Sequence, residues 1–194
     1  MNAYELGKMW EFENSYWWFV ARRRLICTLI DRFVPSERMA GHYLDMGCGT
    51  GRFLEEMMPR PGWKAGLDMS RLALRRTRSR VDHALVEGEG CHAPFADASF
   101  DLITGLDLIE HIRDDVACLA EMCRILKPGG YAIISVPAFE FLWSEHDEAL
   151  YHLRRYSKRA LTLRVREAGL AIVKLTYAVC ALWLPISLAC FIHA

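Results

Sequence analysis

The alternation of short apolar runs with longer stretches of helical periodicity constrains the fold of this chain more than any other feature. The segment 112–126 is helical in pattern, because its apolar residues recur at steps of four, three, four and three. The runs between such segments are apolar throughout rather than at every second position, which is typical of strands buried on both faces. They cover residues 43–46, 63–67, 84–86, 100–105, 131–136 and 170–177. The alternation therefore predicts an α/β fold, doubly wound, with a mostly parallel sheet and helices on both faces.

One domain is expected from the length of 194 residues. Residues 17–33 carry apolar side chains at helical spacing and Pro35 ends that helix, so we expect an N-terminal helical cap over residues 1–40. The sheet then forms a core over residues 41–178, and residues 179–194 form an apolar tail. Hydrophobic residue types make up 53% of the chain, which excludes intrinsic disorder.

Charge and cysteine usage narrow the class of protein. Lys plus Arg and Asp plus Glu both number 24, so the net charge is zero and no nucleic-acid partner is expected. The Arg-rich segment 71–80 has no interleaved aromatic residue and is expected to be a solvated helix face. The seven cysteines include no C-x-x-C pair, which favours a reduced, cytoplasmic setting. The first residues lack the basic and then apolar layout of a signal peptide, which agrees with that location.

A glycine-rich turn follows the first apolar run. Residues 44–51 read Leu-Asp-Met-Gly-Cys-Gly-Thr-Gly, and glycines at alternate positions let the backbone turn sharply close to a ligand. A dinucleotide-binding turn would place its third glycine where Arg52 stands, and no Lys-Ser/Thr pair follows, which excludes a P-loop. Asp45 beside the turn favours a ligand with an ammonium or sulfonium group over a pyrophosphate.

Five motifs in a fixed order carry a resemblance to a known family. The Asp-x-Gly-x-Gly-x-Gly turn resembles motif I of the class I S-adenosylmethionine-dependent methyltransferases, of the type 11/12-like kind. The other four motifs are Asp68, Gly-Glu-Gly at 88–90, Pro-Phe-Ala-Asp-Ala-Ser-Phe-Asp at 94–101 and Leu-Lys-Pro-Gly-Gly at 126–130. The resemblance covers about residues 16–178 and implies a Rossmann-like fold, with S-adenosylmethionine as methyl donor and S-adenosylhomocysteine as product.

The resemblance also implies which residues hold the cofactor. Asp68 would accept hydrogen bonds from the ribose hydroxyls, and Glu89 would meet the adenine amino group, where the family commonly has the shorter Asp. In the alternative, the glycines form only a tight turn and Asp68 only caps the next helix. The cofactor residues implied are Asp45, Gly47, Cys48, Gly49, Gly51, Asp68, Met69, Glu89, Gly90, Asp107, Trp18 and Arg23.

The segment Asp-Leu-Ile-Glu-His at 107–111 is a candidate for the acceptor side. It resembles the D/E-x-x-E-H of quinone-biosynthesis O-methyltransferases, in which the acids and the histidine can hold a divalent ion. The alternative is a helix N-terminus decorated with acids, which the helix dipole favours. We predict that His111 lines the acceptor site and that no metal is bound.

Two further segments resemble a subgroup of bacterial methyltransferases associated with cell-surface polysaccharide or lipid-linked substrates. The loop 143–156 contains an H-D…H-x-R-R-Y run, so His146 and His152 are candidate general bases, unless the loop is only a solvated lid. The subgroup often begins with a W-W-F-x-x-R-R helix. Neighbouring helical indoles diverge by about 100°, so we expect Trp18 to cover the cofactor mouth and Arg23 to pair with the methionine carboxylate. The alternative is a set of core aromatics with an exposed basic turn.

The end of the sequence departs from the family pattern. The family usually finishes with an antiparallel hairpin, but few residues follow the sixth run and Pro185 interrupts them, so we expect the seventh strand to be short, displaced or absent. Either the chain is a fragment of a longer protein, or residues 181–192 form an apolar helix. Such a helix could pack on the domain, pair with a second copy in a homodimer, or make peripheral contact with a membrane.

The expected activity is methyl transfer from S-adenosylmethionine to a small-molecule acceptor, free or linked to a lipid or saccharide. Transfer is an in-line displacement, so the protein mainly aligns donor and acceptor, and a general base matters for a hydroxyl or a protonated amine. The candidate catalytic residues are His111, His146 and His152. A catalytically inactive cofactor-binding scaffold and an RNA or protein methyltransferase are the alternatives.

Overall fold

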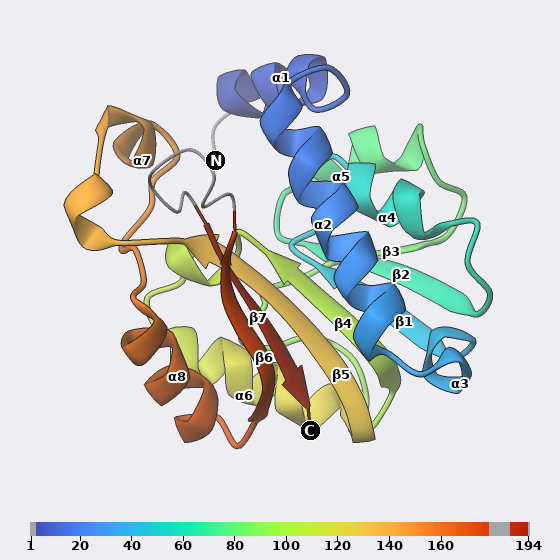
Figure 1. The fold of residues 1–194 in the computed structure, drawn as a ribbon. Helices are drawn as coiled ribbons and strands as arrows, with labels where there is room; N and C mark the ends of the chain where they lie inside the picture. The colour runs from blue at the N-terminus through green and yellow to red at the C-terminus, as the bar shows by residue number, and fades with distance from the viewer. Residues whose placement is uncertain (1–2, 179–186, 194) are drawn as a thin grey trace.

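The computed structural model describes residues 3–178 and 187–193, which build a central seven-stranded sheet (Figure 1). Its strand order is β3-β2-β1-β4-β5-β7-β6, and only the two pairings of β7 are antiparallel. The order reverses between β1 and β4, so their carboxyl ends flank the crevice where ligands bind in sheets of this kind. The strands are β1 (His42–Met46), β2 (Trp63–Asp68), β3 (Ala84–Glu87), β4 (Phe100–Leu106), β5 (Leu126–Pro137), β6 (Ala171–Ala178) and β7 (Ser187–His193).

Helices cover both faces of this sheet, as the sequence predicts. In Figure 1, α2 crosses in front of the sheet and α6 lies behind it. Ile30 of α2 shares a buried cluster with Leu54 of α4, whereas Leu119 of α6 and Leu161 of α8 belong to the cluster on the opposite face. The helices are α1 (Ala3–Phe12), α2 (Trp17–Phe33), α3 (Ser36–Met39), α4 (Arg52–Met57), α5 (Arg71–Arg78), α6 (Asp115–Ile125), α7 (Glu145–Ala149) and α8 (Lys158–Glu167), with 3₁₀ turns η1 (Ile109–His111) and η2 (Glu140–Leu142).

Local sequence signals set the helix ends. Ser70 and Ser157 begin α5 and α8 as N-caps, because their hydroxyls accept hydrogen bonds from the backbone N–H of Ala73 and Ala160. Gly169 follows α8 with a φ of 84°, a conformation that favours glycine at a helix end. These local signals set where α5 begins and where α8 begins and ends.

The C-terminal strand corrects the expectation for the apolar tail. β7 is a seven-residue strand that lies between β5 and β6, pairing from Ser187 with Pro137 to His193 with Tyr131. The expected displacement or loss of the strand is therefore wrong, and so is the alternative helix for residues 187–192; residues 181–186 lie outside the described part. Pro185 precedes the strand in the sequence, and β7 itself contains no proline. Within the described ranges, no helix combines the length and the apolar character needed to cross a membrane.

The loop between β5 and α8 has more structure than the sequence indicates. The short helix α7 begins at Ser144, where a capping box joins the Ser144 and Asp147 side chains to each other's backbone N–H. Two backbone hydrogen bonds then join the loop to the end of β5 and to η1. The N–H of Tyr156 donates to Pro137 O, and the N–H of Leu153 donates to Glu110 O. The loop is therefore fixed over the carboxyl end of β4.

Candidate functional site

In the glycine turn after β1, other side chains pack closely against two of the glycines, and the space beside the third is open. Gly47, Gly49 and Gly51 have φ values of 76°, 55° and 76°, in the left-handed region that favours glycine. A Cβ on Gly47 would lie 2.8 Å from Leu108 Cδ1, and a Cβ on Gly51 would overlap the side chain of Thr77. A Cβ on Gly49 would meet nothing within 4 Å. The turn therefore leaves room for a ligand at Gly49.

Asp68, at the end of β2, holds the glycine turn. Its Oδ2 accepts a hydrogen bond of 2.8 Å from Gly49 N, and its Oδ1 accepts one of 2.8 Å from Ser70 N. Burial raises the pKa of this carboxyl, while these two hydrogen bonds oppose the shift. The N-cap of α5 is Ser70 rather than Asp68. A carboxylate has about four acceptor positions, so Asp68 keeps positions for ligand hydroxyls.

Asp45 lies beneath the turn and is only 3% exposed. Its Oδ1 accepts a hydrogen bond of 2.7 Å from Thr104 Oγ1, which also lies 2.6 Å from Tyr43 Oη. Burial raises the pKa of Asp45 to about 7, although the Thr104 hydrogen bond and the Arg22 charge lower it. Its ionised form is favoured by a positively charged group placed beside it.

Two neighbouring arginines of α2 have different partners. Arg23 donates from Nη1 to the backbone oxygen of Glu13 at 2.5 Å, and its Nε lies 3.8 Å from Glu56. Arg22 instead forms an ion pair with Asp107 and interacts electrostatically with Glu110 and Asp45. Arg23 is the residue expected at the cofactor, whereas Arg22 is the one that lies beside Asp107 and interacts with Asp45.

Helical periodicity explains why the sequence alone does not distinguish Arg22 from Arg23. Arg22 and Arg23 both lie about one turn before Ile26, which is buried, so periodicity does not separate them. The structure does separate them, because the Arg22 Nε is buried without a hydrogen-bond partner beside Asp107. Trp18 is half-buried and packs edge-on against Trp17, with ring centroids 6.0 Å apart.

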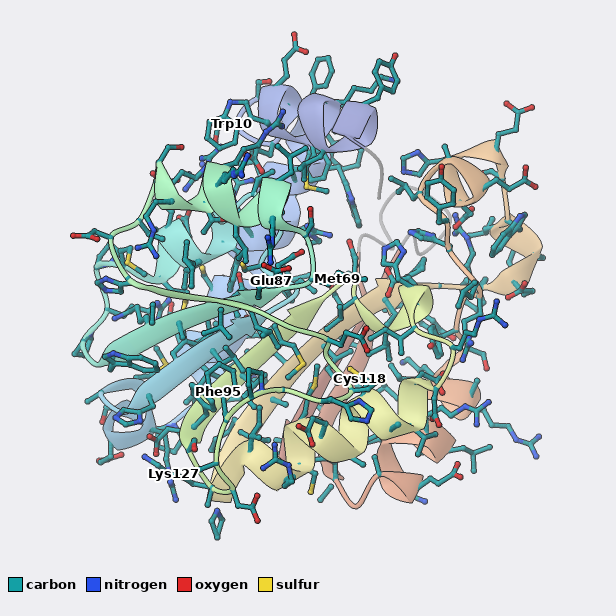
Figure 2. The ribbon with its side chains drawn as sticks, turned by 180° about the vertical axis from the view of Figure 1, so that it is seen from behind. Trp10, Met69, Glu87, Phe95, Cys118 and Lys127 are labelled. Carbon is teal, nitrogen blue, oxygen red and sulfur yellow. The ribbon has the colours of Figure 1, made fainter. Side chains whose placement is uncertain are left out.

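The remaining residues expected at the cofactor lie around the same strand ends. Met69 follows Asp68, is 71% exposed and is labelled in Figure 2. Glu89 is exposed in the loop after β3, and a Cβ on Gly90 would lie 3.1 Å from Cys118 Sγ. Cys48 is buried, and burial raises the pKa of its thiol, so it is not a ready nucleophile.

Glu13 links the N-terminal cap to the glycine turn, although no sequence pattern pointed to this residue. Glu13 is 3% exposed, accepts a hydrogen bond of 2.5 Å from Thr50 Oγ1 and forms an ion pair with Arg80. Arg80 also lies over the ring of Trp10, 3.9 Å from its centroid, so α1 rests on the end of α5 (Figure 2). Glu13 is an acidic residue in a polar stretch of the sequence, so nothing in the sequence indicated that its side chain is buried.

The segment expected on the acceptor side forms a compact polar group, made by η1 and the loop after β5. A Glu110 carboxylate oxygen and ring nitrogens of His111 and His152 all lie within 4.8 Å of one another. Glu110 is fully buried and neither of its carboxylate oxygens has a hydrogen-bond partner, and burial raises its pKa to about 8. Burial and the nearby His152 lower the pKa of His111 to about 4, so its ring is neutral at pH 7. Such a group can surround an acceptor hydroxyl or a divalent ion.

Only part of the expected catalytic set is brought together. His111 and His152 lie with ring centroids 4.8 Å apart, whereas His146 is exposed on α7. Asp147 of α7 contacts two residues farther along the same loop. Its Oδ1 is 2.8 Å from His152 Nδ1, and its Oδ2 accepts a hydrogen bond of 2.7 Å from Arg155 Nη2. The H-D…H-x-R-R run pointed to this loop without indicating which side chain is buried.

The residues around the crevice fit S-adenosylmethionine. The open space at Gly49, the acceptor positions of Asp68 and the carboxylate of Asp45 suit a ligand with a sugar and a positively charged end. A pyrophosphate would find Asp45 and Asp68 where it needs positive charge. When bound, S-adenosylmethionine supplies a methyl group on a positively charged sulfur.

Comparison with known proteins agrees with this fit. A family model described as a methyltransferase domain matches residues 18–175. The chain is 29% identical over 153 residues to the ubiquinone biosynthesis O-methyltransferase of Thiobacillus denitrificans, covering 69% of this chain and 66% of that enzyme. It is 35% identical over 140 residues to the demethylmenaquinone methyltransferase of Mycobacterium sp. strain KMS, covering 69% of this chain and 56% of that enzyme. The chain thus spans no more than about two thirds of the length of these relatives.

Solved structures share the fold. The S-adenosylmethionine-dependent methyltransferase of Clostridium acetobutylicum superposes with a TM-score of 0.77 at 14% identity, over 99% of both chains. That of Mesorhizobium loti superposes with a TM-score of 0.72 at 16% identity, over 86% of this chain and 96% of the other. The family match over most of the chain, the strand order and the glycine turn lead to one assignment: this chain belongs to the class I S-adenosylmethionine-dependent methyltransferases, of the type 11/12-like kind.

Proposed function

We propose that the chain transfers a methyl group from S-adenosylmethionine to a small-molecule acceptor, free or linked to a lipid or saccharide. The observation that carries this proposal is the unpartnered, buried carboxyl of Glu110 beside His111 and His152. A buried polar group without a partner is costly, so a ligand that supplies the missing hydrogen bonds is expected there. The relatives named for ubiquinone biosynthesis and for demethylmenaquinone support an acceptor of small-molecule size.

The glycine turn supports a proposal for how the cofactor binds. We propose that Asp68 binds the ribose hydroxyls, that Glu89 meets the adenine amino group, and that Asp45 and Asp107 face the positively charged end. Arg22 is the better candidate than Arg23 for the methionine carboxylate, because its buried Nε has no hydrogen-bond partner, whereas the Nη1 and Nε of Arg23 already meet Glu13 and Glu56. The acceptor then enters between η1 and the loop that carries α7.

The cofactor assignment is tested by calorimetry on Asp68→Ala. Loss of a hydrogen bond to a charged group should weaken S-adenosylmethionine binding by about 1.5–3 kcal/mol, or roughly 10- to 160-fold. Asp82→Ala is the matched control, because the Asp82 side chain is fully exposed next to Arg78. Unchanged affinity in Asp68→Ala, with the thermal unfolding curve preserved, contradicts the assignment.

The acceptor class is tested by turnover. The wild-type protein is incubated with S-adenosylmethionine and separate panels of phenols, hydroxy acids, lipid-linked saccharides, peptides and RNA, and S-adenosylhomocysteine and methylated products are measured by mass spectrometry. Turnover in a small-molecule or lipid-linked panel supports the proposal. Turnover only with peptides or RNA contradicts it, and tight donor binding without turnover in any panel favours an inactive scaffold.

A further inference from the structure

Asp147 fixes one tautomer of His152. The Asp147 carboxylate is fully buried and accepts hydrogen bonds of 2.8 Å from Arg155 Nε, 2.7 Å from Arg155 Nη2 and 2.9 Å from Ser144 N. Although burial raises the pKa of Asp147, the bonds from Arg155 and His152 hold it well below its usual range, so the group is ionised. An ionised carboxylate only accepts hydrogen bonds, so the His152 Nδ1 at 2.8 Å carries the proton.

Burial lowers the pKa of His152, so its ring carries one proton at pH 7 and the Nε2 nitrogen keeps its lone pair. The side chain is 8% exposed, and its ring packs against that of His111 at an interplanar angle of 71°. A ring nitrogen of His111 and an oxygen of the Glu110 carboxyl, which has no hydrogen-bond partner, lie within 4.8 Å of a ring nitrogen of His152. The Leu153 N–H bond of 2.8 Å to Glu110 O holds the loop and η1 in this arrangement.

This group lies next to the expected position of the methyl donor. Arg22 interacts electrostatically with both Glu110 and Asp45, which lies beneath the glycine turn. Asp107, which pairs with Arg22, also accepts a bond of 2.9 Å from Ser135 Oγ and precedes η1. An acceptor atom held by the Glu110–His152 group would thus lie near an arginine that also interacts with Asp45.

We infer that Asp147 and Arg155 position His152 as the general base that deprotonates a hydroxyl group of the acceptor. This inference rests on the proposed function and narrows it to O-methylation. His152 Nε2 takes the proton from the hydroxyl as the oxygen attacks the methyl carbon. The new C–O bond forms as the C–S bond breaks, and its electron pair stays on the sulfur, which becomes a neutral thioether. The imidazolium, stabilised by the Asp147 charge, then releases the proton to solvent.

The tautomer is measured first, because this measurement needs no acceptor. Long-range proton–nitrogen NMR spectra of the ¹⁵N-histidine-labelled full chain with S-adenosylhomocysteine should show Nδ1 of His152 protonated and Nε2 bare. The His152→Gln spectrum assigns the signals. Asp147→Asn should remove the preference, because an amide can donate to Nδ1, whereas Glu145→Gln, an exposed site on the same helix, should preserve it.

Turnover is measured next with matched probes, catechol as the hydroxyl acceptor and o-phenylenediamine as the amine. Asp147→Asn and His152→Ala should lower kcat on catechol by roughly 10²- to 10⁴-fold, the usual range for a positioned general base and its orienting carboxylate. The Kd for S-adenosylmethionine should change by less than about twofold, because neither side chain meets the donor in the proposed arrangement. Added imidazole should restore part of the His152→Ala activity, which a purely structural role would not allow.

Three results overturn the inference. They are a proton on Nε2 of His152 in the wild-type protein, methylation of the amine probe alone, and full kcat in folded His152→Ala. Each of them leaves the methyltransferase assignment intact when S-adenosylmethionine still binds. Failure of the wild-type protein to bind S-adenosylmethionine would overturn the proposed function instead. If Asp147→Asn fails to fold, the tautomer in the wild-type protein and the imidazole rescue still decide the matter.

Discussion

At the scale of residues, the glycines of the turn differ in what surrounds them, and this difference can be tested. Gly49→Ala places a methyl group in open space, so its cost to folding is the left-handed backbone alone, about 1 kcal/mol. Gly51→Ala adds an overlap with Thr77, which is fully buried, so its cost should be larger by about 1–3 kcal/mol. Urea unfolding measures both.

Although Gly49→Ala should cost less folding stability than Gly51→Ala, it should have the larger direct effect on S-adenosylmethionine binding. Gly49→Ala fills the space offered to the ligand, so it should weaken S-adenosylmethionine binding while the protein stays folded. Equal affinity of Gly49→Ala and wild type in calorimetry would contradict the position assigned to the cofactor. Thermal unfolding of each variant is the accompanying control.

The raised pKa of Asp45 predicts a pH dependence of stability. The unfolded chain releases the Asp45 proton near the ordinary value of 3.8, and the folded protein releases it at about 7, so the folded state binds more protons between these values. The contribution is fully present below about pH 4 and is lost as the pH rises through 7. In urea unfolding from pH 4 to pH 8, Asp45→Asn should therefore lose less stability than wild type.

The control for this prediction is Asp82→Asn, because Asp82 is exposed. Its stability should follow that of wild type across the same pH range. Parallel curves for Asp45→Asn and wild type would show that the folded protein ionises Asp45 near its ordinary pKa.

At the scale of elements, Glu13 joins the α1–α2 hairpin to the glycine turn. Glu13→Ala leaves the buried Arg80 without this ion pair and Thr50 without its acceptor, so we expect a loss of about 3 kcal/mol or more in local stability. Hydrogen exchange should accelerate in α1 and in the turn, and S-adenosylmethionine binding should weaken. Glu11→Ala, an exposed site on α1, should change neither. Exchange that stays slow in Glu13→Ala would contradict a link through this side chain.

The sequence predicts the parallel strands well because strands buried on both faces leave continuous apolar runs. β1, β2 and β4 end within a residue or two of the predicted runs. β7 was not predicted, because Pro185 followed by an uncharged apolar run is also typical of an apolar helix. Its pairing partner β5 lies far away in the sequence, so the pairing leaves no local pattern. The family resemblance contained the information, since its hairpin is present here.

The site was only partly predictable for a related reason. The glycine turn and Asp68 are local in the sequence, and the structure brings them together. His152 could be named as a candidate, but the burial of Asp147 and the bond to Arg155 depend on how the loop folds back on β5. Arg22 could not be separated from Arg23 until the partners of each were known.

At the scale of the whole molecule, cofactor binding should stabilise the fold. A ligand present at a hundred times its Kd adds about 2.7 kcal/mol to the free energy of unfolding. For a chain of 194 residues this corresponds to a rise in Tm of about 5–11 °C. Thermal shift assays with S-adenosylmethionine and S-adenosylhomocysteine should show the rise, and methionine alone at the same concentration should not. An unchanged Tm with both ligands would contradict binding to the native fold.

The position of β7 has a consequence for synthesis on the ribosome. β7 is made after both of its neighbours, and it occupies an inner place in the sheet, with β5 on one side and β6 on the other. Until residues 187–193 have left the exit tunnel, the nascent chain displays the free hydrogen-bonding edge of β5, an edge that other polypeptides can join. Ribosomes that pause before this strand should therefore leave an intermediate that depends on chaperones.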